Sequence, residues 1–382
     1  MKVTGIRSVL YGYELARPIG DVHLPEGATH GVELAVFVDT DEPGLTGETI
    51  GPPAAADMID RLAPLVVGED PRAVKAIWQR LMDVAFKAGN AGAIKVAIAS
   101  IDCALWDLRA KAHGVPLYLE LGASSGEVPA YASGLDTPLD DDELAAFYGR
   151  MATEAGIHAG KLKVGRDREA DLRRLDIMSS ALARSGRKPG LIVDANEFWS
   201  VKQAVQRVRE MEAQHELVWV EEPVRRWDVD GLRRVSDAIS APVATGENLD
   251  DVHDYVPLVR GGGVDLVQIG FHTTGITGAL QVADLADAFD LPVALMNCPA
   301  RFTAHMAAAL PHHTMMEVFD MGRAPAVVEV PPIRDGKIML SSEPGSGVRF
   351  DLERLERLAV TELPEGTLAT MYRRAPDSGK VG

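Results

Sequence analysis

The sequence predicts an α/β protein in which a (β/α)8-type, TIM-like barrel follows a smaller α+β domain. From residue 128 onward, short apolar runs alternate with amphipathic helical segments such as the one at 201–214, which indicates a parallel sheet. There are eight such runs, at 128–133, 158–165, 190–196, 217–223, 241–248, 264–270, 291–297 and 312–319. Eight units favour a closed barrel. A doubly wound open sheet is the alternative, but no GxGxxG motif opens the first unit.

The region before residue 126 does not show this regular alternation of strands and helices, and we expect it to form the α+β domain. Strand-like sequence extends to about residue 50, and helical patterns follow at roughly 56–66, 72–88 and 93–114. We therefore predict three parts: an N-terminal domain at 1–125, a barrel at 126–325, and a C-terminal segment at 326–382. We expect the last segment to close the barrel and to pack on the first domain.

Composition excludes several classes of protein. The formal net charge of −17 argues against nucleic-acid and anionic-membrane partners, which need clustered lysine and arginine. The chain has no apolar run of about 18 or more residues, so we expect no membrane span. Cys103 and Cys298 lack the CxxC or Cys/His spacing of a zinc site or a disulfide framework. We expect a soluble cytoplasmic protein that acts on a small molecule.

Three neighbouring strands of the predicted barrel each end in an acidic residue. VDAN places Asp194 on one strand, VEEP places Glu221 on the next, and TGEN places Glu247 on the third. The carboxyl ends of the strands meet at one rim, where three carboxylates would repel one another unless a cation lay among them. Carboxylates suit hard cations, so we predict a Mg²⁺ site, with Mn²⁺ as the alternative ion. Glu222 should point to the other side of its strand.

The stretch AGKLKVG at 159–165 places two lysines on the strand beside Asp194. Because alternate residues of a strand face the same side, Lys161 and Lys163 should enter one space. A like charge and a nearby cation lower the pKa of a lysine, which suits it to act as a base. Removal of a proton next to a carboxylate leaves an enediolate, which needs a metal ion or well-placed donors. The sequence thus predicts metal-assisted proton abstraction from a carboxylate substrate.

Together these motifs resemble the enolase superfamily, in particular the mandelate racemase-like branch of its mandelate racemase/muconate lactonizing enzyme family. The resemblance covers nearly the whole chain and includes the segment at 99–123, the KxK pair, VDAN, VEEP and TGEN. It implies an N-terminal capping domain and one Mg²⁺ held by the three acids. It also implies that Lys163 abstracts the α-proton, that Lys161 tunes this base, and that Glu317, ending the last strand, hydrogen-bonds a substrate carboxylate.

The chain departs from this branch where a second base is expected. Similar proteins place a His at the end of the seventh strand, supported by an Asp at the end of the sixth. Here Asn297 stands at the first position, and Ile269 or Gly270 at the second. With a base on one face only, we favour β-elimination of water from a sugar acid or another hydroxy acid, giving a 2-keto acid. Racemisation or epimerisation of a hydroxy- or amino-acid derivative is the first alternative, and metal-dependent ligand binding without turnover is the second.

Substrate specificity should come from a long loop near the N-terminus and from the barrel rim. The loop at 16–30 offers Asp21 and His23 as substrate contacts. At the rim we expect contacts from Asn196, Asn297 and His272, and His272 is also a candidate to assist elimination. The resemblance further implies a homo-oligomer, from dimer to octamer.

Overall fold

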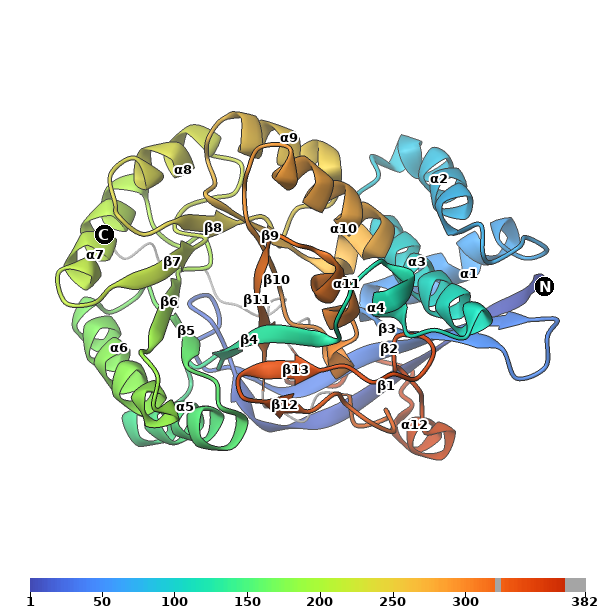
Figure 1. The fold of residues 1–382 in the computed structure, drawn as a ribbon, viewed down its shortest axis with the longest axis horizontal. Helices are drawn as coiled ribbons and strands as arrows, with labels where there is room; N and C mark the ends of the chain where they lie inside the picture. Colours follow the sequence, from blue (N-terminus) through green and yellow to red (C-terminus); the bar gives the residue numbers. More distant parts are fainter. Residues whose placement is uncertain (320–323, 368–382) are drawn as a thin grey trace.

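The computed structural model describes residues 1–319 and 324–367, and these form a sheet-and-helix domain beside a closed barrel (Figure 1). The N-terminal sheet is antiparallel, has the order β1-β2-β3, and consists of β1 (Val3–Ile19), β2 (Ala28–Thr40) and β3 (Thr46–Gly51). Its helices are α1 (Ala56–Leu62), α2 (Val74–Ala85), α3 (Gly92–His113) and the short α4 (Leu117–Glu120).

The barrel follows, and it confirms the predicted fold class. Its parallel strands are β4 (Glu127–Ser133), β5 (Ala159–Lys163), β6 (Gly190–Asp194), β7 (Leu217–Glu221), β8 (Val243–Thr245), β9 (Leu266–Ile269), β10 (Val293–Leu295) and β11 (His313–Val318). Around them lie α5 (Asp141–Ala155), α6 (Arg168–Leu182), α7 (Val201–Glu212), α8 (Val229–Ser236), α9 (Val252–Arg260), α10 (Phe271–Asp287) and α11 (Ala304–Ala309). Side-chain caps begin several of these helices, among them Asp140 before α5 and Ser200 before α7.

The barrel closes between its first and last strands. β11 pairs with β4 in parallel, with Glu317 opposite Tyr131. Closure therefore does not need the segment after residue 326, contrary to the expectation from the sequence. That segment instead adds β13 (Lys337–Met339), which pairs antiparallel with the first residues of β4, and β12 (Ile333–Arg334), which pairs antiparallel with β13. The domain boundaries at 125 and 325 stay predictions.

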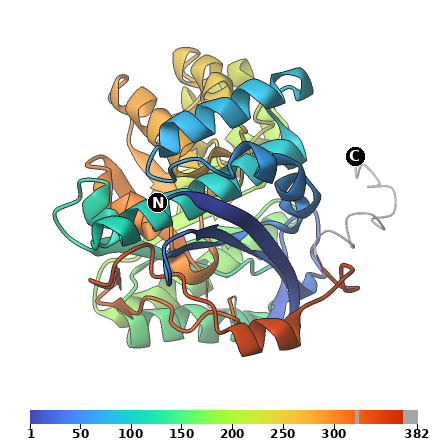
Figure 2. The same cartoon turned by 90° about the vertical axis from the view of Figure 1, so that its right-hand side faces the viewer.

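The C-terminal segment also reaches the N-terminal domain. Helix α12 (Leu352–Leu358) lies against β1 (Figure 2). Just beyond it, the backbone N–H of Val360 donates to the carbonyl of Leu10 at 2.9 Å. In the part of the chain that the structure describes, no helix is long and apolar enough to cross a membrane.

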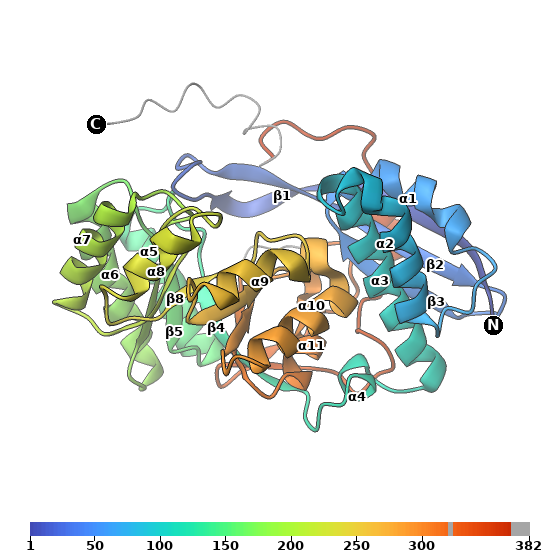
Figure 3. The same ribbon diagram turned by 90° about the horizontal axis from the view of Figure 1, so that it is seen from above.

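Two features of the N-terminal domain position it over the barrel. Strands β1 and β2 form a long hairpin whose tip extends above the barrel (Figure 3). In the loop at 20–27, which joins β1 to β2 at the hairpin tip, Gly20 donates its N–H to the carbonyl of Leu135 at 2.8 Å. Helix α3 packs on α10, where Asp102 accepts the N–H of Thr277 at 2.8 Å. These contacts fix the hairpin tip relative to the strand ends.

The inside of the barrel is filled rather than open. A cluster of buried side chains occupies it: Tyr131, Ala159, Ile192, Trp219, Ala244, Leu266 and Ala294. The rings of Tyr131 and Trp219 meet edge to face with centroids 5.2 Å apart. Because the interior is packed, a substrate can enter only at an end of the strands.

Candidate active site

The predicted lysines and acids meet at the carboxyl ends of adjacent strands. The parallel register pairs Lys163 at the end of β5 with Asp194 at the end of β6, and Asp194 with Glu221 at the end of β7. Lys161 lies two residues before Lys163 and therefore faces the same space. All four side chains are buried. The local strand pattern thus places both lysines beside the acids, as the sequence predicted.

Carboxylates hold both lysines. Lys163 Nζ lies 2.5 Å from Asp194 Oδ2. Lys161 Nζ donates a hydrogen bond to Glu221 Oε1 and lies 2.8 Å from Glu317 Oε1. Anions from three strands therefore stabilise the two like charges in this buried space.

By themselves, the carboxylates raise the pKa of Lys163. Burial is the largest single effect and lowers this pKa, but the combined attraction of Asp194, Glu221 and Glu317 outweighs burial and the repulsion from Lys161, so the pKa lies above the ordinary lysine value. The lowered pKa was predicted for a lysine beside a bound cation, and it stays a prediction. A divalent cation among the carboxylates would offset their attraction and bring the pKa of Lys163 down.

The rim holds more carboxylates than lysines. Glu222 and Glu247 stand beside the acids that contact the lysines. Burial, reinforced by neighbouring carboxylates, raises the pKa of Glu222 to about 8. Burial also raises the pKa of Glu247 to about 8, against the opposing attraction of Lys161. The site therefore holds more carboxyl groups than the two lysines can pair with, and their burial and mutual repulsion favour the protonated forms unless a cation lies among them.

This donor set fits a hard divalent cation, which prefers carboxylate oxygens. Within residues 1–319 and 324–367, no three acidic, His or Cys side chains lie close enough together here to ligate one ion. Lys161 Nζ lies among the carboxylates of Asp194, Glu221 and Glu317. The remaining excess of carboxylate is what a Mg²⁺ ion would neutralise, and Asp194, Glu221 and Glu247 stay the predicted ligands.

A cavity of about 680 Å³ lies between this rim and the N-terminal hairpin. Of the predicted site residues, it is lined by Asp21, His23, Lys161, Lys163, Asn196, Glu247, His272 and Glu317. Asp194 and Glu221 are fully buried and contact the lining lysines. Asn297 is buried too, and its backbone N–H donates to Glu317 Oε2 at 3.0 Å. The structure thus brings the predicted residues to one place, with Asn297 behind Glu317 rather than at the lining.

The hairpin tip is attached to the barrel beside the acids. The ring Nε2 of His23 lies 2.7 Å from the carbonyl oxygen of Asn196. Asp21 shapes the loop, because its Oδ1 accepts the backbone N–H of His23 at 2.7 Å. Arg166, after β5, donates to the carbonyl of Val22 at 2.5 Å. The loop therefore covers the cavity as part of its wall.

The strand ends that carry a second base in similar proteins carry none here. β9 ends at Ile269 and Gly270 follows it. β10 is followed by Met296, which lines the cavity, and by Asn297. Among the described residues of this part of the barrel wall, His272 at the start of α10 is the basic side chain that lines the cavity.

Glu222 lies where the sequence did not predict it. β7 ends at Glu221, and Glu222 adopts a left-handed backbone conformation with φ of 41°. Its side chain therefore lines the cavity, and Asn248 Nδ2 donates to its Oε1 at 2.8 Å. Alternation of side chains holds only within a strand, and Pro223 in the VEEP motif was the signal that the strand ends early.

Two buried residues that no sequence motif indicated, Asp136 and Tyr148, support the strand β5 that carries the lysines. Asp136, in the loop after β4, accepts the backbone N–H of Lys163 at 3.2 Å and the Tyr148 hydroxyl at 2.7 Å. The same hydroxyl lies 2.5 Å from the carbonyl oxygen of Lys161. Asp136 and Tyr148 thus fix the backbone at both lysines from the side of α5.

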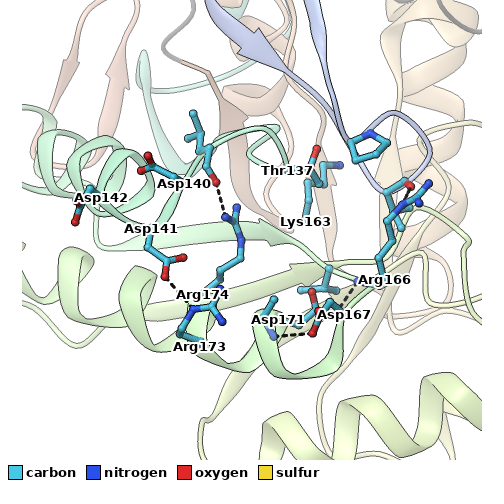
Figure 4. Close-up of a pocket in the computed structure, with 16 residues that line it drawn as sticks. Thr137, Asp140, Asp141, Asp142, Lys163, Arg166, Asp167, Asp171, Arg173 and Arg174 are labelled. Carbon is cyan, nitrogen blue, oxygen red and sulfur yellow. Dashed lines mark hydrogen bonds and ion pairs between the residues drawn. The ribbon is translucent and has the colours of Figure 1, made fainter.

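A second cavity, of about 660 Å³, lies beside the loop that follows β5, next to α5 and α6 (Figure 4). Its arginines already have partners. Arg173 donates to Asp141 Oδ2 at 2.9 Å, and Arg174 donates to the carbonyl of Leu139 at 2.7 Å. Asp171 accepts the N–H of Gly165 at 2.9 Å. These contacts hold α5, α6 and the loop together, which is a structural role.

Comparison with known proteins agrees with this site. Residues 143–355 match the family model described as enolase C-terminal domain-like, and residues 28–122 match the N-terminal domain of mandelate racemase/muconate lactonizing enzymes. The chain belongs to the mandelate racemase/muconate lactonizing enzyme family of the enolase superfamily. It is therefore an enzyme that carries out the chemistry of this superfamily, as the motifs predicted.

Several relatives are similar over most of their length. A 3,6-anhydro-α-L-galactonate cycloisomerase from Streptomyces coelicolor is 33% identical over 93% of this chain and 99% of its own. An L-talarate/galactarate dehydratase from Salmonella typhimurium is 35% identical over 75% of this chain and 71% of its own.

Solved structures support the fold and the cofactor. The structure of a racemase from Streptomyces coelicolor with bound magnesium is 31% identical, has a TM-score of 0.85, and covers 94% of this chain and 100% of its own. The Salmonella dehydratase with Mg and L-lyxarohydroxamate has a TM-score of 0.86 at 28% identity, covering 94% of this chain and 93% of its own. The predicted Mg²⁺ cofactor is confirmed at the level of the family.

Proposed function

We propose that this enzyme removes water from a sugar acid, or from another hydroxy acid, to give a 2-keto acid. The observation that carries the proposal is that the site has a lysine base on one side of the cavity and no second base at the strand ends opposite. A paired lysine lines the cavity beside the acids, whereas Asn297 and Ile269 stand where similar proteins carry a second base and its support. A single base suffices for elimination, and the similarity to a sugar-acid dehydratase supports the same reaction.

Lys163 is the base in this proposal. Its Nζ is held at Asp194 and its side chain lines the cavity, where it takes the proton from the carbon next to the substrate carboxylate. Mg²⁺, held by Asp194, Glu221 and Glu247, would supply positive charge where negative charge develops on that carboxylate. Lys161 would orient the carboxylate by donating a hydrogen bond to it. Glu317, whose Oε1 lies 2.8 Å from Lys161 Nζ, would position this lysine and would donate a second hydrogen bond only in its protonated form.

The β-hydroxyl group then leaves as water. Its proton comes from Lys163, which returns the proton it took from the α-carbon, or from His272 at the cavity wall. The C–O bond breaks as the α,β double bond forms, and the resulting enol tautomerises to the 2-keto acid. No oxidant or reductant takes part.

An isomerase is the second candidate, because the relative that matches this chain over 93% of its length is a cycloisomerase. A cycloisomerase opens or closes a ring within its substrate, so no water is lost. In racemisation or epimerisation, the abstracted proton is replaced at the α-carbon and again no water is lost. His272 would then act as the second acid. Binding of a ligand without turnover is the third candidate.

One experiment separates these candidates. The enzyme is incubated with Mg²⁺ and a panel of sugar acids and amino-acid derivatives in D₂O, and the products are read by mass spectrometry and NMR. Loss of water to a 2-keto acid supports the dehydratase. Deuterium at the α-carbon without loss of water would instead establish the isomerase, and binding without either change would establish the non-catalytic protein.

We further propose that the enzyme is a cytoplasmic homo-oligomer. The apolar side chains of Val84 and Phe86, at the end of α2, are exposed in the described chain and would be covered in an assembly. Light scattering of the purified protein tests this, and a monomeric mass would contradict it.

A further inference from the structure

In the described ranges 1–319 and 324–367, the outer part of the catalytic cavity carries two arginines and one carboxylate that pairs with them. Arg225 and Arg226 follow β7, and both line the cavity. Glu197, in the loop after β6, is the carboxylate that both arginines approach, and it is almost fully buried. One carboxylate balances one of the two guanidinium groups.

Arg226 is the arginine that Glu197 neutralises. Its Nε donates to Glu197 Oε1, and its backbone N–H donates to the same oxygen at 3.2 Å. Its Nη1 donates to the carbonyl of Asn248 at 2.8 Å. These bonds fix Arg226 between the loops after β6, β7 and β8.

Arg225 remains open to a further anion. Its Nη1 is 3.7 Å from Glu197 Oε2, too far for a hydrogen bond, and its guanidinium donates none within the described chain. The guanidinium lies 5.7 Å from the ring centroid of Trp227, a contact that orients it at the rim. Its side chain is 49% exposed. By contrast, Arg173 and Arg174 in the second cavity both donate to acceptors of the protein (Figure 4).

Arg225 stands within reach of a ligand bound at the lysines. Glu222 lines the inner end of the cavity, and Arg225 lies three residues after it in the chain. The Cα atoms of Glu222 and Arg225 are therefore at most about 11 Å apart. The carbon chain of a six-carbon acid, with five C–C bonds of about 1.5 Å, spans roughly 6 Å. One end of such a molecule can lie at Lys163 while the flexible side chain of Arg225 meets the other.

We propose that Arg225 is a subsite for the distal carboxylate of a dicarboxylic sugar acid. The proposal rests on the proposed function, because it takes the carboxylate at the lysines as the reacting one. Glu222, Glu247 and Glu317 make the inner end unsuited to a second anion without its own cation. A guanidinium binds a carboxylate through paired hydrogen bonds, and this geometry selects a diacid over the monoacid that ends in a hydroxymethyl group.

The test measures binding without turnover. Lys163→Ala, loaded with Mg²⁺, is titrated by calorimetry with matched pairs of ligands: galactarate and galactonate, glucarate and gluconate, mannarate and mannonate. The same titrations are made with Arg225→Gln added. Arg233→Gln is the matched control, because Arg233 on α8 is 48% exposed and pairs with Asp230 and Asp237 instead of lining the cavity.

We expect at least one diacid to bind tenfold or more tightly than its monoacid. Arg225→Gln should remove that preference by weakening the diacid alone, and Arg233→Gln should change neither affinity. Equal affinities within every pair, including no binding by either member, would overturn the subsite. So would an equal loss for both members of a pair in Arg225→Gln.

The subsite and the reaction fail in different ways. If the wild-type enzyme dehydrates monoacids as well as diacids, the proposed function stands and the subsite is wrong. If the diacid preference depends on Arg225 but the wild-type enzyme neither exchanges the α-proton nor releases water, the subsite stands and the proposed function is wrong.

Discussion

Lys163 lines two cavities, and these cavities differ in whether their charged side chains have partners within the protein. In the second cavity, beside α5 and α6, Arg173 and Arg174 have acceptors and Asp171 has a donor. In the catalytic cavity, buried carboxylates outnumber the lysines, and the guanidinium of Arg225 donates no hydrogen bond to the described residues. Charges that a protein leaves unbalanced mark places where a metal ion or a ligand supplies the balance. The second cavity is therefore part of the scaffold, and the first is the site.

Among variants in the two cavities, replacement of the proposed base should have the largest effect on activity. Lys163→Ala is expected to lower kcat/KM by about a thousandfold or more, because general base catalysis contributes factors of this order. Its thermal unfolding should remain cooperative. The measurement is turnover of the substrate found in the D₂O panel, with circular dichroism as the control for folding. Activity within tenfold of the wild type would contradict the role of Lys163.

Replacement of the acids at the rim should distinguish the carboxylates that ligate Mg²⁺ from those that only lie near it. We expect Glu247→Gln to weaken Mg²⁺ binding by at least about a hundredfold, because it removes a predicted ligand. Glu222→Gln, the matched variant just after the neighbouring strand, should weaken binding by less than about tenfold, as expected for an outer carboxylate. Both affinities are measured by calorimetry on metal-free protein. The reverse order would assign Glu222 as the ligand and would contradict the prediction from the sequence.

The support of the lysine strand should affect activity less. Tyr148→Phe removes the hydroxyl that lies between Asp136 Oδ2 and the carbonyl of Lys161. We expect about a tenfold loss of kcat with KM changed less than threefold, and a loss of stability of about 1–2 kcal/mol from the unpaired acceptors. Steady-state kinetics and urea unfolding measure the two effects. If stability falls while kcat does not, the hydroxyl has a structural role only.

A variant in the second cavity should change the pH dependence of stability and leave activity alone. Burial raises the pKa of Asp171 to about 6, against the hydrogen bond from Gly165, which acts in the other direction. The folded protein therefore binds more protons than the unfolded chain between about pH 4 and pH 6, and this residue makes stability fall as the pH rises through that window.

Asp171→Asn keeps an acceptor for Gly165 but removes the ionisation. The stability of the variant relative to the wild type should rise from about pH 4 to pH 6 and then level off, by up to about 3 kcal/mol. Urea unfolding at half-unit pH steps measures the difference. A constant difference across this range would show that Asp171 titrates as an ordinary carboxyl group.

The sequence predicted the parts of the site that depend on one strand at a time. Alternation within β5 was enough to place Lys161 and Lys163 on one side, and strand ends were enough to bring Asp194 and Glu221 to one rim. The same rule failed at Glu222, because the strand ends one residue earlier and the backbone turns into a left-handed conformation there. A pattern of alternation does not contain that turn.

By itself, then, the sequence determined the barrel and the family and led to the proposed base and acids, because period and motif are local properties of the chain. Tertiary structure decided how those groups act on one another. Carboxylates from three strands together raise the pKa of Lys163 against the effect of burial, and the guanidinium of Arg225 is open because Glu197 is hydrogen-bonded to Arg226 instead. Such balances depend on distances between residues far apart in the chain, and those distances exist only after the strands and loops have come together.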